Sequence, residues 1–230
     1  MSTARQRVVS LVPSATESLR FWGRDPIACT RFCEQDDLVH VGGTKDPDIQ
    51  AIIDLRPDLV VLEREENRLP DHDELVAAGL DVEVLHITSL ADVDPEMARL
   101  ASRVDAAWVP FELGPPIAQR CVAFVPIWKR PWMTFNESTY AASLLAHLGV
   151  ESLAAGHEPT YPELSEDELS CAAPVAVLAP SEPYPFAERH RVELEQFGPV
   201  TFIDGQDLFW WGTRSSDAVS RLREALVHLG

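Results

Sequence analysis

Short apolar runs alternate with amphipathic segments through the first part of the chain, beginning with the run VVSLVP. Runs of this length, rich in β-branched residues, are typical of buried strands, whereas apolar positions at helical spacing indicate helices packed on a sheet. The expected strands cover 7–13, 26–30, 58–62 and 82–87, and the expected helices begin at Ser14, Asp46 and Asp71. Strands that alternate with helices in this way predict parallel βαβ units.

The second half repeats the alternation after a longer amphipathic segment. From Asp94 to Trp108 the apolar residues fall on one helical face, and the Gly-Pro-Pro run at 114–116 must end any helix. The expected strands are 121–128, 174–180 and 200–204, and the expected helices are 138–149, 186–197 and 215–229. The pattern predicts an α/β protein of two Rossmann-like lobes with parallel sheets, 1–93 and 121–230. A single bridging helix segment, 94–120, would join them, with a cleft between the lobes.

Composition narrows the classes of partner and location. Of 230 residues, 46% are hydrophobic and 24% are charged, which is typical of a globular protein and not of a disordered one. The formal charge of −18 repels phosphate backbones and anionic lipid, so we expect neither nucleic acid nor membrane insertion. No signal-like apolar stretch precedes Pro13, and none precedes Cys29 as a lipobox would require. We therefore expect a cytoplasmic protein with four free thiols.

Polar candidates gather in the loops that follow the first strands, where open α/β sheets bind their ligands. Cys33 is the better candidate for an exposed or reactive thiol, since Cys29 ends a strand. Lys45 follows paired glycines before a helix start, an arrangement that favours an anion, although a tight turn with a solvated lysine fits equally. Glu66 and Asn67 lie in the charged run EREENR, and Glu66 is placed to pair with Lys45. Such runs are otherwise solvated surface.

Aromatic side chains gather in three loops of the second half. Flat apolar walls with a few polar groups suit a large planar or polycyclic ligand, although aromatic residues also form ordinary cores. The candidate wall comprises Trp128, Trp132, Tyr184, Phe186, Trp210 and Trp211, and the candidate polar anchors are Ser14, Lys45, Glu66, Asn67 and Arg214. No nucleophile–base set or dinucleotide fingerprint is found, and no Cys or His pair completes a metal site with Cys29 and Cys33, so we expect no catalytic residues and no metal site.

Several segments resemble a known family. The stretches VVSLVPSATE, VGGTKDPDIQAI and LRPDLV, together with WKRPWMTFN, SEPYPF and DGQDLFWWGTR, are similar to the iron-siderophore and vitamin B12 (class III) substrate-binding proteins of ABC transporters. The likeness is to the cobalamin-binding-protein-like branch, often called helical-backbone metal receptors, and covers nearly the whole chain. It implies two α/β lobes bridged by a helix, a corrinoid or metal chelate bound as ligand rather than as a required cofactor, and an ABC-transporter permease as partner.

The sequence therefore predicts a small-molecule binding protein rather than an enzyme. Cys33 joins the ligand-binding candidates because its loop lies at the same edge of the sheet. Two alternatives stay open at this point. One is a cytosolic enzyme that uses Cys33 as nucleophile or thiolate ligand beside Lys45 and Glu66. The other is a transporter-associated interaction protein with no ligand of its own.

Overall fold

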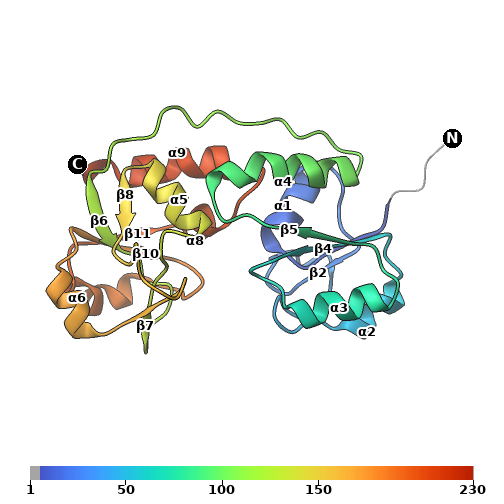
Figure 1. Cartoon of the computed structure of the whole chain (residues 1–230), viewed down its shortest axis with the longest axis horizontal. Coiled ribbons are helices and arrows are strands. Elements are labelled where there is room, and N and C mark those ends of the chain that lie inside the picture. The colour runs from blue at the N-terminus through green and yellow to red at the C-terminus, as the bar shows by residue number, and fades with distance from the viewer. Residues whose placement is uncertain (1–5, 230) are drawn as a thin grey trace. The chain divides into compact units, whose positions relative to one another are not determined.

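The computed structural model describes residues 6–229, and the chain divides into two compact units (Figure 1). Unit 1 contains the chain up to Ile87, Ala91–Pro110 and Trp211–Thr213, and unit 2 contains Thr88–Leu90, Phe111–Trp210 and the chain from Arg214 onward. Each unit has its own parallel sheet. The expected α/β fold with parallel sheets in two lobes is confirmed. The expected boundaries differ, because residues 211–213 of the late chain belong to the first unit.

Unit 1 contains a five-stranded sheet in the order β3-β2-β1-β4-β5, with every neighbouring pair parallel. The strands are β1 Val8–Ser10, β2 Ala28–Cys29, β3 Val39–His40, β4 Leu59–Glu63 and β5 Val82–Leu85. All residues of β1 and β4 are buried, which is why their apolar runs are readable in the sequence. The edge strand β3 was not expected, because it has only two residues and both are exposed.

Four helices cover this sheet, with α1 and α4 on one face and α2 and α3 on the other (Figure 1). Their bounds are α1 Pro13–Phe21, α2 Ile49–Leu55, α3 Leu69–Ala77 and α4 Leu90–Arg103. Neither Ser14 nor Asp71 is the helix cap that the sequence suggests. Pro13 and Pro70 occupy the first turns of α1 and α3, where a fixed φ and a missing N–H are tolerated, and so these helices begin earlier.

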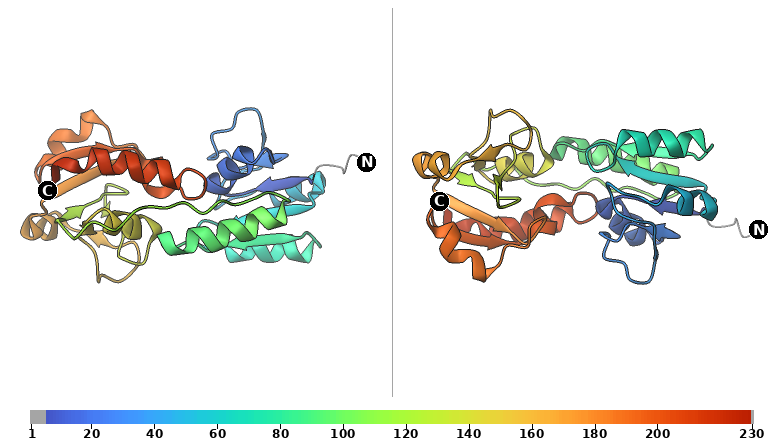
Figure 2. Two further views of the ribbon diagram at one scale, coloured as in Figure 1. Left: turned by 90° about the horizontal axis from the view of Figure 1, so that it is seen from above. Right: turned by 90° about the horizontal axis from the view of Figure 1, so that it is seen from below.

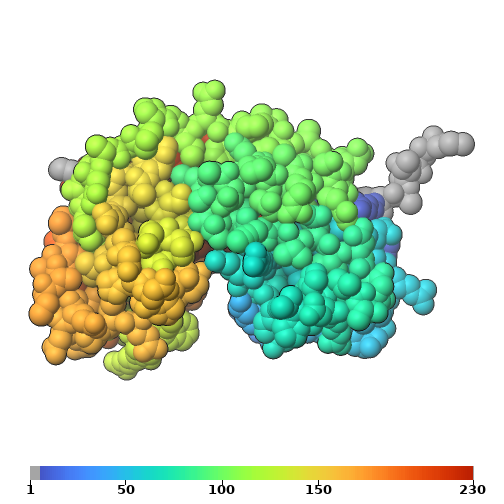
Figure 3. Space-filling model, in the orientation of Figure 1, coloured from blue at the N-terminus to red at the C-terminus, as the bar shows by residue number. Residues whose placement is uncertain are grey.

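The segment expected to form the bridging helix is helical only in its first part. Helix α4 begins at Leu90 and ends at Arg103, and the chain contains no helix from 104 to 120 (Figure 2). Asp105 adopts a left-handed φ of 52°, and the prolines that follow cannot continue a helix. Most side chains of this stretch are exposed or half-buried at the surface (Figure 3). Trp108 is therefore not on α4, and its ring packs edge-on against Trp22 at 6.2 Å.

Unit 2 contains a four-stranded parallel sheet in the order β11-β10-β6-β8 and a small antiparallel pair, β7-β9. The strands are β6 Cys121–Phe124, β7 Trp132–Met133, β8 Val150–Ser152, β9 Glu163–Leu164, β10 Ala176–Pro180 and β11 Val200–Ile203. The helices are α5 Tyr140–His147, α6 Glu166–Ala172, α7 Arg191–Glu195, α8 Gly205–Phe209 and α9 Ser215–Ala225, with 3-10 turns η1 Glu188–His190 and η2 Val227–Leu229. Helix α5 packs on β8, whereas α7 and α9 pack on β11.

Several of these elements were not expected from the sequence. Helix α6 buries only Leu169 and is held by a capping box between Ser165 and Glu168, so it has no apolar stripe to detect. The helix expected over 186–197 is shorter, since η1 precedes α7 there. Within residues 6–229, no helix has both the length and the apolar character needed to span a membrane.

Candidate functional site

The carboxyl edge of the unit 1 sheet is organised by a buried acidic residue, Glu63, at the end of β4. Its side chain is 2% exposed and accepts hydrogen bonds from the backbone N–H groups of Glu65 (2.6 Å), Glu66 (3.0 Å) and Ile87 (3.3 Å). Desolvation raises the pKa of Glu63, and the backbone hydrogen bonds oppose that shift. The sequence analysis assigned Glu63 to a charged loop. Glu63 directly continues an apolar strand run, and this position could have indicated that it is the buried last residue of the strand.

Asn67 ties three segments of this edge together. Its Oδ1 accepts from the N–H of Glu63 at 2.8 Å, and its Nδ2 donates to the carbonyls of Leu11 (3.3 Å) and Thr44 (3.0 Å). The side chain is buried, so every polar atom that it carries is used within unit 1. The exposed Lys45 donates to the carbonyl of Glu65 at 2.5 Å, and the side chain of Glu66 is half-buried in the same loop.

The paired glycines before Lys45 form a closed turn. The N–H of Gly43 donates to the carbonyl of Asp46 at 3.2 Å. Gly42 has a φ of 87°, and a Cβ at that position would lie 2.5 Å from the same carbonyl oxygen. These glycines are required by the turn itself.

Cys33 lies beneath the surface, contrary to the expectation of an exposed thiol. It is 1% exposed, its sulfur lies 3.2 Å from the hydroxyls of Thr16 and Thr30, and its N–H donates to the Thr30 carbonyl to close a turn. The neighbouring Cys29 thiol and the hydroxyls of Thr16 and Thr30 lower the pKa of Cys33, whereas the neighbouring Cys33 thiol and burial raise the pKa of Cys29.

Ser14 and Trp211 are also buried, and they contact each other within unit 1. The Trp211 N–H donates to the Ser14 hydroxyl at 3.3 Å, and the Thr213 N–H donates to the Ser18 hydroxyl at 3.2 Å. The two side chains are 1% and 3% exposed, respectively. The hydroxyls of α1 therefore hold residues 211–213 in place.

In unit 2, the loops after β6 and β10 bring together a half-exposed aromatic pair. Trp128 is 46% exposed and meets Tyr184 edge-on, with ring centroids 5.3 Å apart. Lys129 lies 5.9 Å from the Tyr184 ring centroid and forms an ion pair with Glu193 at 2.5 Å. Because β6 and β10 are parallel neighbours, both loops leave the same edge of the sheet.

The other aromatic candidates are mostly core residues. Trp132 and Phe186 are 6% and 4% exposed and stack on each other at 6.3 Å. Trp210 is 9% exposed and has the Arg214 guanidinium 5.1 Å from its ring centroid. Arg214 also contacts Asp207 at 3.6 Å. Among the candidate aromatic residues of unit 2, Trp128 and Tyr184 are therefore half-exposed, whereas Trp132, Phe186 and Trp210 are buried.

The sequence analysis missed His190 beside the aromatic pair. Its ring lies 5.6 Å from the rings of both Tyr184 and Phe186, and its Nδ1 accepts the N–H of Ala187 at 3.1 Å. Desolvation, with Arg189 and Lys129 nearby, lowers the pKa of His190, so the ring is neutral and its proton is on Nε2.

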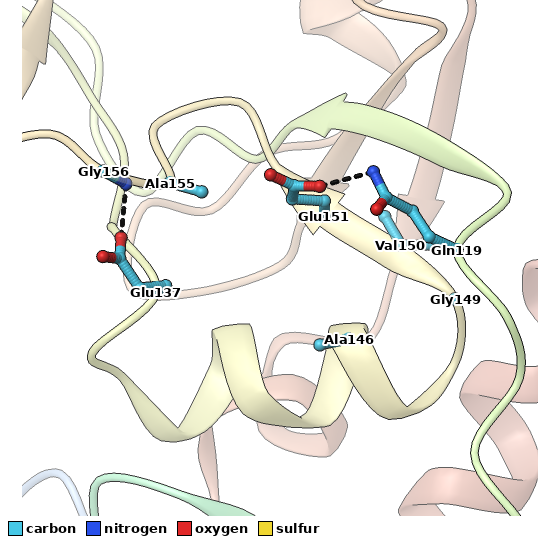
Figure 4. Close-up of a pocket in the computed structure, with 8 residues that line it drawn as sticks. All are labelled: Gln119, Glu137, Ala146, Gly149, Val150, Glu151, Ala155 and Gly156. Carbon is cyan, nitrogen blue, oxygen red and sulfur yellow. Dashed lines mark hydrogen bonds between the residues drawn. The ribbon is translucent and has the colours of Figure 1, made fainter.

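A pocket of about 500 Å³ lies elsewhere in unit 2, beside the edge strand β8 (Figure 4). Glu137 accepts the N–H of Gly156 at 2.5 Å, which lowers its pKa, and Glu151 accepts a hydrogen bond from Gln119. None of the predicted site residues lines this pocket. A smaller pocket of about 310 Å³ adjoins Trp132 and Arg130. Across residues 6–229, no group of three His, Cys, Asp or Glu side chains is placed to hold a metal ion.

Comparison with known proteins identifies similar binding proteins, although no protein-family model matches the chain. A vitamin B12-binding protein of Pectobacterium carotovorum is 23% identical over 199 residues, covering 77% of this chain and 72% of that protein. The crystal structure of a periplasmic vitamin B12 binding protein of Vibrio cholerae has a TM-score of 0.79 and 16% identity, covering 97% of both chains. The periplasmic heme-binding protein BhuT, solved with two hemes, has a TM-score of 0.78 and 18% identity, covering 98% and 99%.

These findings confirm the resemblance to the siderophore and vitamin B12 class of substrate-binding proteins. They also confirm the expectation of a binding protein rather than an enzyme. The expected cytoplasmic location is wrong. Both structural neighbours are periplasmic proteins, which points to a periplasmic or extracytoplasmic location. That expectation rested on the first residues of the chain, which do not decide location.

Proposed function

We propose that this protein is the substrate-binding component of an ABC transporter and takes a tetrapyrrole-type metal chelate, a corrinoid or a heme, as its ligand. The observation that carries the proposal is the half-exposed pair Trp128 and Tyr184 at the carboxyl edge of the unit 2 sheet. The named ligands of the similar proteins, vitamin B12 and heme, support this ligand class. The chelate is cargo for delivery to the permease and not a cofactor.

The aromatic pair has the chemistry that a macrocycle requires. A tetrapyrrole presents a broad apolar face and carboxylate or amide groups around its rim. Trp128 offers a ring with 46% of its surface free, and Lys129 places an ammonium group beside Tyr184. Flat apolar contact with a few polar groups at the margin is the usual composition of such sites. Trp132, Phe186 and Trp210 would hold these loops rather than contact the ligand.

In unit 1, the candidate ligand contacts are the exposed Lys45 and the half-buried Glu66 at the carboxyl edge, whereas Asn67, Ser14 and Cys33 have a supporting role. Lys45 is the exposed cation of this edge's closed glycine turn, so it can meet an acidic rim group of the ligand. Asn67 and Ser14 already use their polar atoms on the protein backbone. Arg214 is half-buried with its guanidinium over the Trp210 ring, so it would position that ring and not contact the ligand.

A direct titration tests the proposal. The purified protein is titrated separately with hemin and with aquacobalamin, and binding is followed by the visible absorbance of each chelate and by tryptophan fluorescence. A tryptophan side chain presents up to about 250 Å². Trp128 is 46% exposed, so a ligand that covers it fully would bury roughly 110 Å² of its surface. Burial of that area should contribute about 2–3 kcal/mol to the binding free energy.

We therefore expect Trp128→Ala to weaken binding about 10- to 100-fold, because each 1.4 kcal/mol is about tenfold in Kd. Phe21→Ala is the matched control. Phe21 is an exposed aromatic residue at the end of α1, away from the strand ends, and its removal should leave affinity unchanged. Failure of the wild-type protein to bind either chelate would overturn the proposal.

A further inference from the structure

Two buried thiols, Cys29 and Cys33, lie together at the carboxyl end of β2, and the proposed function does not use them. Cys29 is the last residue of the strand and has no exposed surface, while Cys33 is 1% exposed. The Cys33 sulfur lies 3.2 Å from the hydroxyl of Thr30, the residue that directly follows Cys29, and the Cys33 N–H donates to the Thr30 carbonyl at 3.1 Å, so both thiols belong to one tight turn. Both residues belong to unit 1.

Two threonine hydroxyls lie against the Cys33 sulfur. The hydroxyls of Thr16, on α1, and Thr30, in the turn, each lie 3.2 Å from it. Hydrogen bonds to a sulfur favour its thiolate form, and the thiolate is the form that attacks disulfides. Cys33 is thus prepared as the attacking thiol, with Cys29 adjacent as the resolving thiol.

The turn that covers Cys33 is thin. Thr30 and Cys33 are joined by a backbone hydrogen bond at 3.1 Å, and the two residues between them, Arg31 and Phe32, are exposed at the surface. Opening of this turn would uncover Cys33, whereas Cys29 is held in the sheet, where its carbonyl accepts the N–H of Val41 at 2.9 Å.

We propose that Cys29 and Cys33 form a reversible disulfide, with a small or protein disulfide as the oxidant. The Cys33 thiolate attacks one sulfur of the oxidant, its S–S bond breaks, and one thiol leaves. The Cys29 sulfur, after losing its proton, attacks the Cys33 sulfur of the mixed disulfide and releases the second thiol. Two protein thiols are oxidised, and the two electrons reduce the oxidant to two thiols.

Two observations favour a disulfide over a metal site at this pair. A metal held by two thiolates needs further ligands, and among residues 6–229 no third His, Cys, Asp or Glu joins these cysteines. The similar structures are periplasmic proteins, and disulfides form and persist in that compartment.

The sequence supplies a sharp assay, because Arg31 lies between the two cysteines. The full-length protein is equilibrated in graded mixtures of reduced and oxidised glutathione, quenched in acid, unfolded, blocked with N-ethylmaleimide and digested with trypsin. A Cys29–Cys33 disulfide joins the tryptic peptides 25–31 and 32–45 into one species, which mass spectrometry detects. The exposed Cys171 reports that the oxidant is active.

We expect the linked peptides to increase more than tenfold from the most reducing to the most oxidising mixture, and to disappear after treatment with dithiothreitol. In Cys29→Ser, the resolving thiol is missing, and Cys33 should accumulate as a mixed disulfide with glutathione. The proposal is overturned if both peptides carry only N-ethylmaleimide while Cys171 is glutathionylated. A stable mixed disulfide at Cys33 in the wild-type protein would overturn it as well. Neither result depends on whether a chelate binds.

Discussion

Trp132 and Trp128 are four residues apart, yet the structure gives them opposite roles, and substitution separates these roles. Trp132 is 6% exposed and packs against Phe124 (6.0 Å), Phe197 (5.4 Å) and Phe186 (6.3 Å) in the core of unit 2. Removing a core tryptophan to alanine costs about 3–5 kcal/mol, because transfer energy is lost and a cavity remains. Trp132→Ala should therefore destabilise unit 2 by roughly 4 kcal/mol.

That loss is a large fraction of the roughly 5–15 kcal/mol by which most domains are stable. At about 3 °C per kcal/mol for a domain of this size, the unit 2 unfolding transition should fall by roughly 10 °C. Scanning calorimetry and urea unfolding measure the change against the wild-type protein. Trp132→Phe keeps an aromatic ring and should recover more than half of the loss.

Trp128→Ala is the matched control, since its ring is 46% exposed and should cost less than about 1 kcal/mol. The reasoning is refuted if Trp132→Ala unfolds at the wild-type temperature. It is refuted equally if Trp128→Ala is the more destabilised of the two variants, because the assignment of core and surface would then be reversed.

Three other substitutions test two positions in unit 1 and the ion pair between Asp207 and Arg221 in unit 2. Burial raises the pKa of Glu63, so the folded state disfavours the charged carboxylate. The stability of the wild-type protein relative to Glu63→Gln should therefore fall as the pH rises from 4.5, the ordinary pKa of this carboxyl, through its raised pKa in the folded state. Urea unfolding at several pH values measures that difference, and a pH-independent difference would contradict it. Gly212→Ala should destabilise by more than about 1 kcal/mol, since φ is 101° and a Cβ would lie within van der Waals overlap of the Ser18 hydroxyl. Thermal unfolding decides it, with an unchanged midpoint as the contrary result. Asp207→Asn should cost about 1–3 kcal/mol, because Asp207 is buried and accepts two 2.6 Å hydrogen bonds from the half-exposed Arg221. Loss of that pair should also weaken the salt dependence of unfolding, and a variant as stable as wild type would refute it.

The layered fold could be predicted because its strands are buried on both faces. Such strands leave continuous apolar runs, as in β1, β4 and β10. The elements that escaped prediction lack this signature. Strand β3 is exposed and helix α6 buries one side chain, so each is stabilised by pairing or capping that composition does not record. The start of α4 was also misplaced: the helical face was expected from Asp94, whereas the helix begins at Leu90 and contains Pro95.

The candidate site was less predictable, because residue type does not determine exposure. The sequence places Trp128, Trp132, Tyr184 and Phe186 in equivalent aromatic loops. Trp132 is distinguished from Trp128 by its packing against Phe124, eight residues earlier, and Phe197, 65 residues later, and Phe186 stacks on Trp132. Cys33 was misplaced for the same reason, since its position in a loop suggested exposure and its side chain is buried.

The polar candidates show a deeper limit. A serine or asparagine at the carboxyl end of a strand has the chemistry to bind a ligand and equally the chemistry to bind the protein's own backbone. The amide of Asn67 accepts a hydrogen bond from Glu63 and donates to the carbonyls of Leu11 and Thr44, and these bonds hold three loops together at one edge of the sheet. Ser14 accepts the N–H of a residue 197 positions away in the chain. Backbone groups at loop ends must find partners when buried, so side chains such as these are recruited first to complete the fold. The exposed side chains at each sheet edge, Lys45 in unit 1 and Trp128 in unit 2, are therefore the ones that we propose for ligand contact.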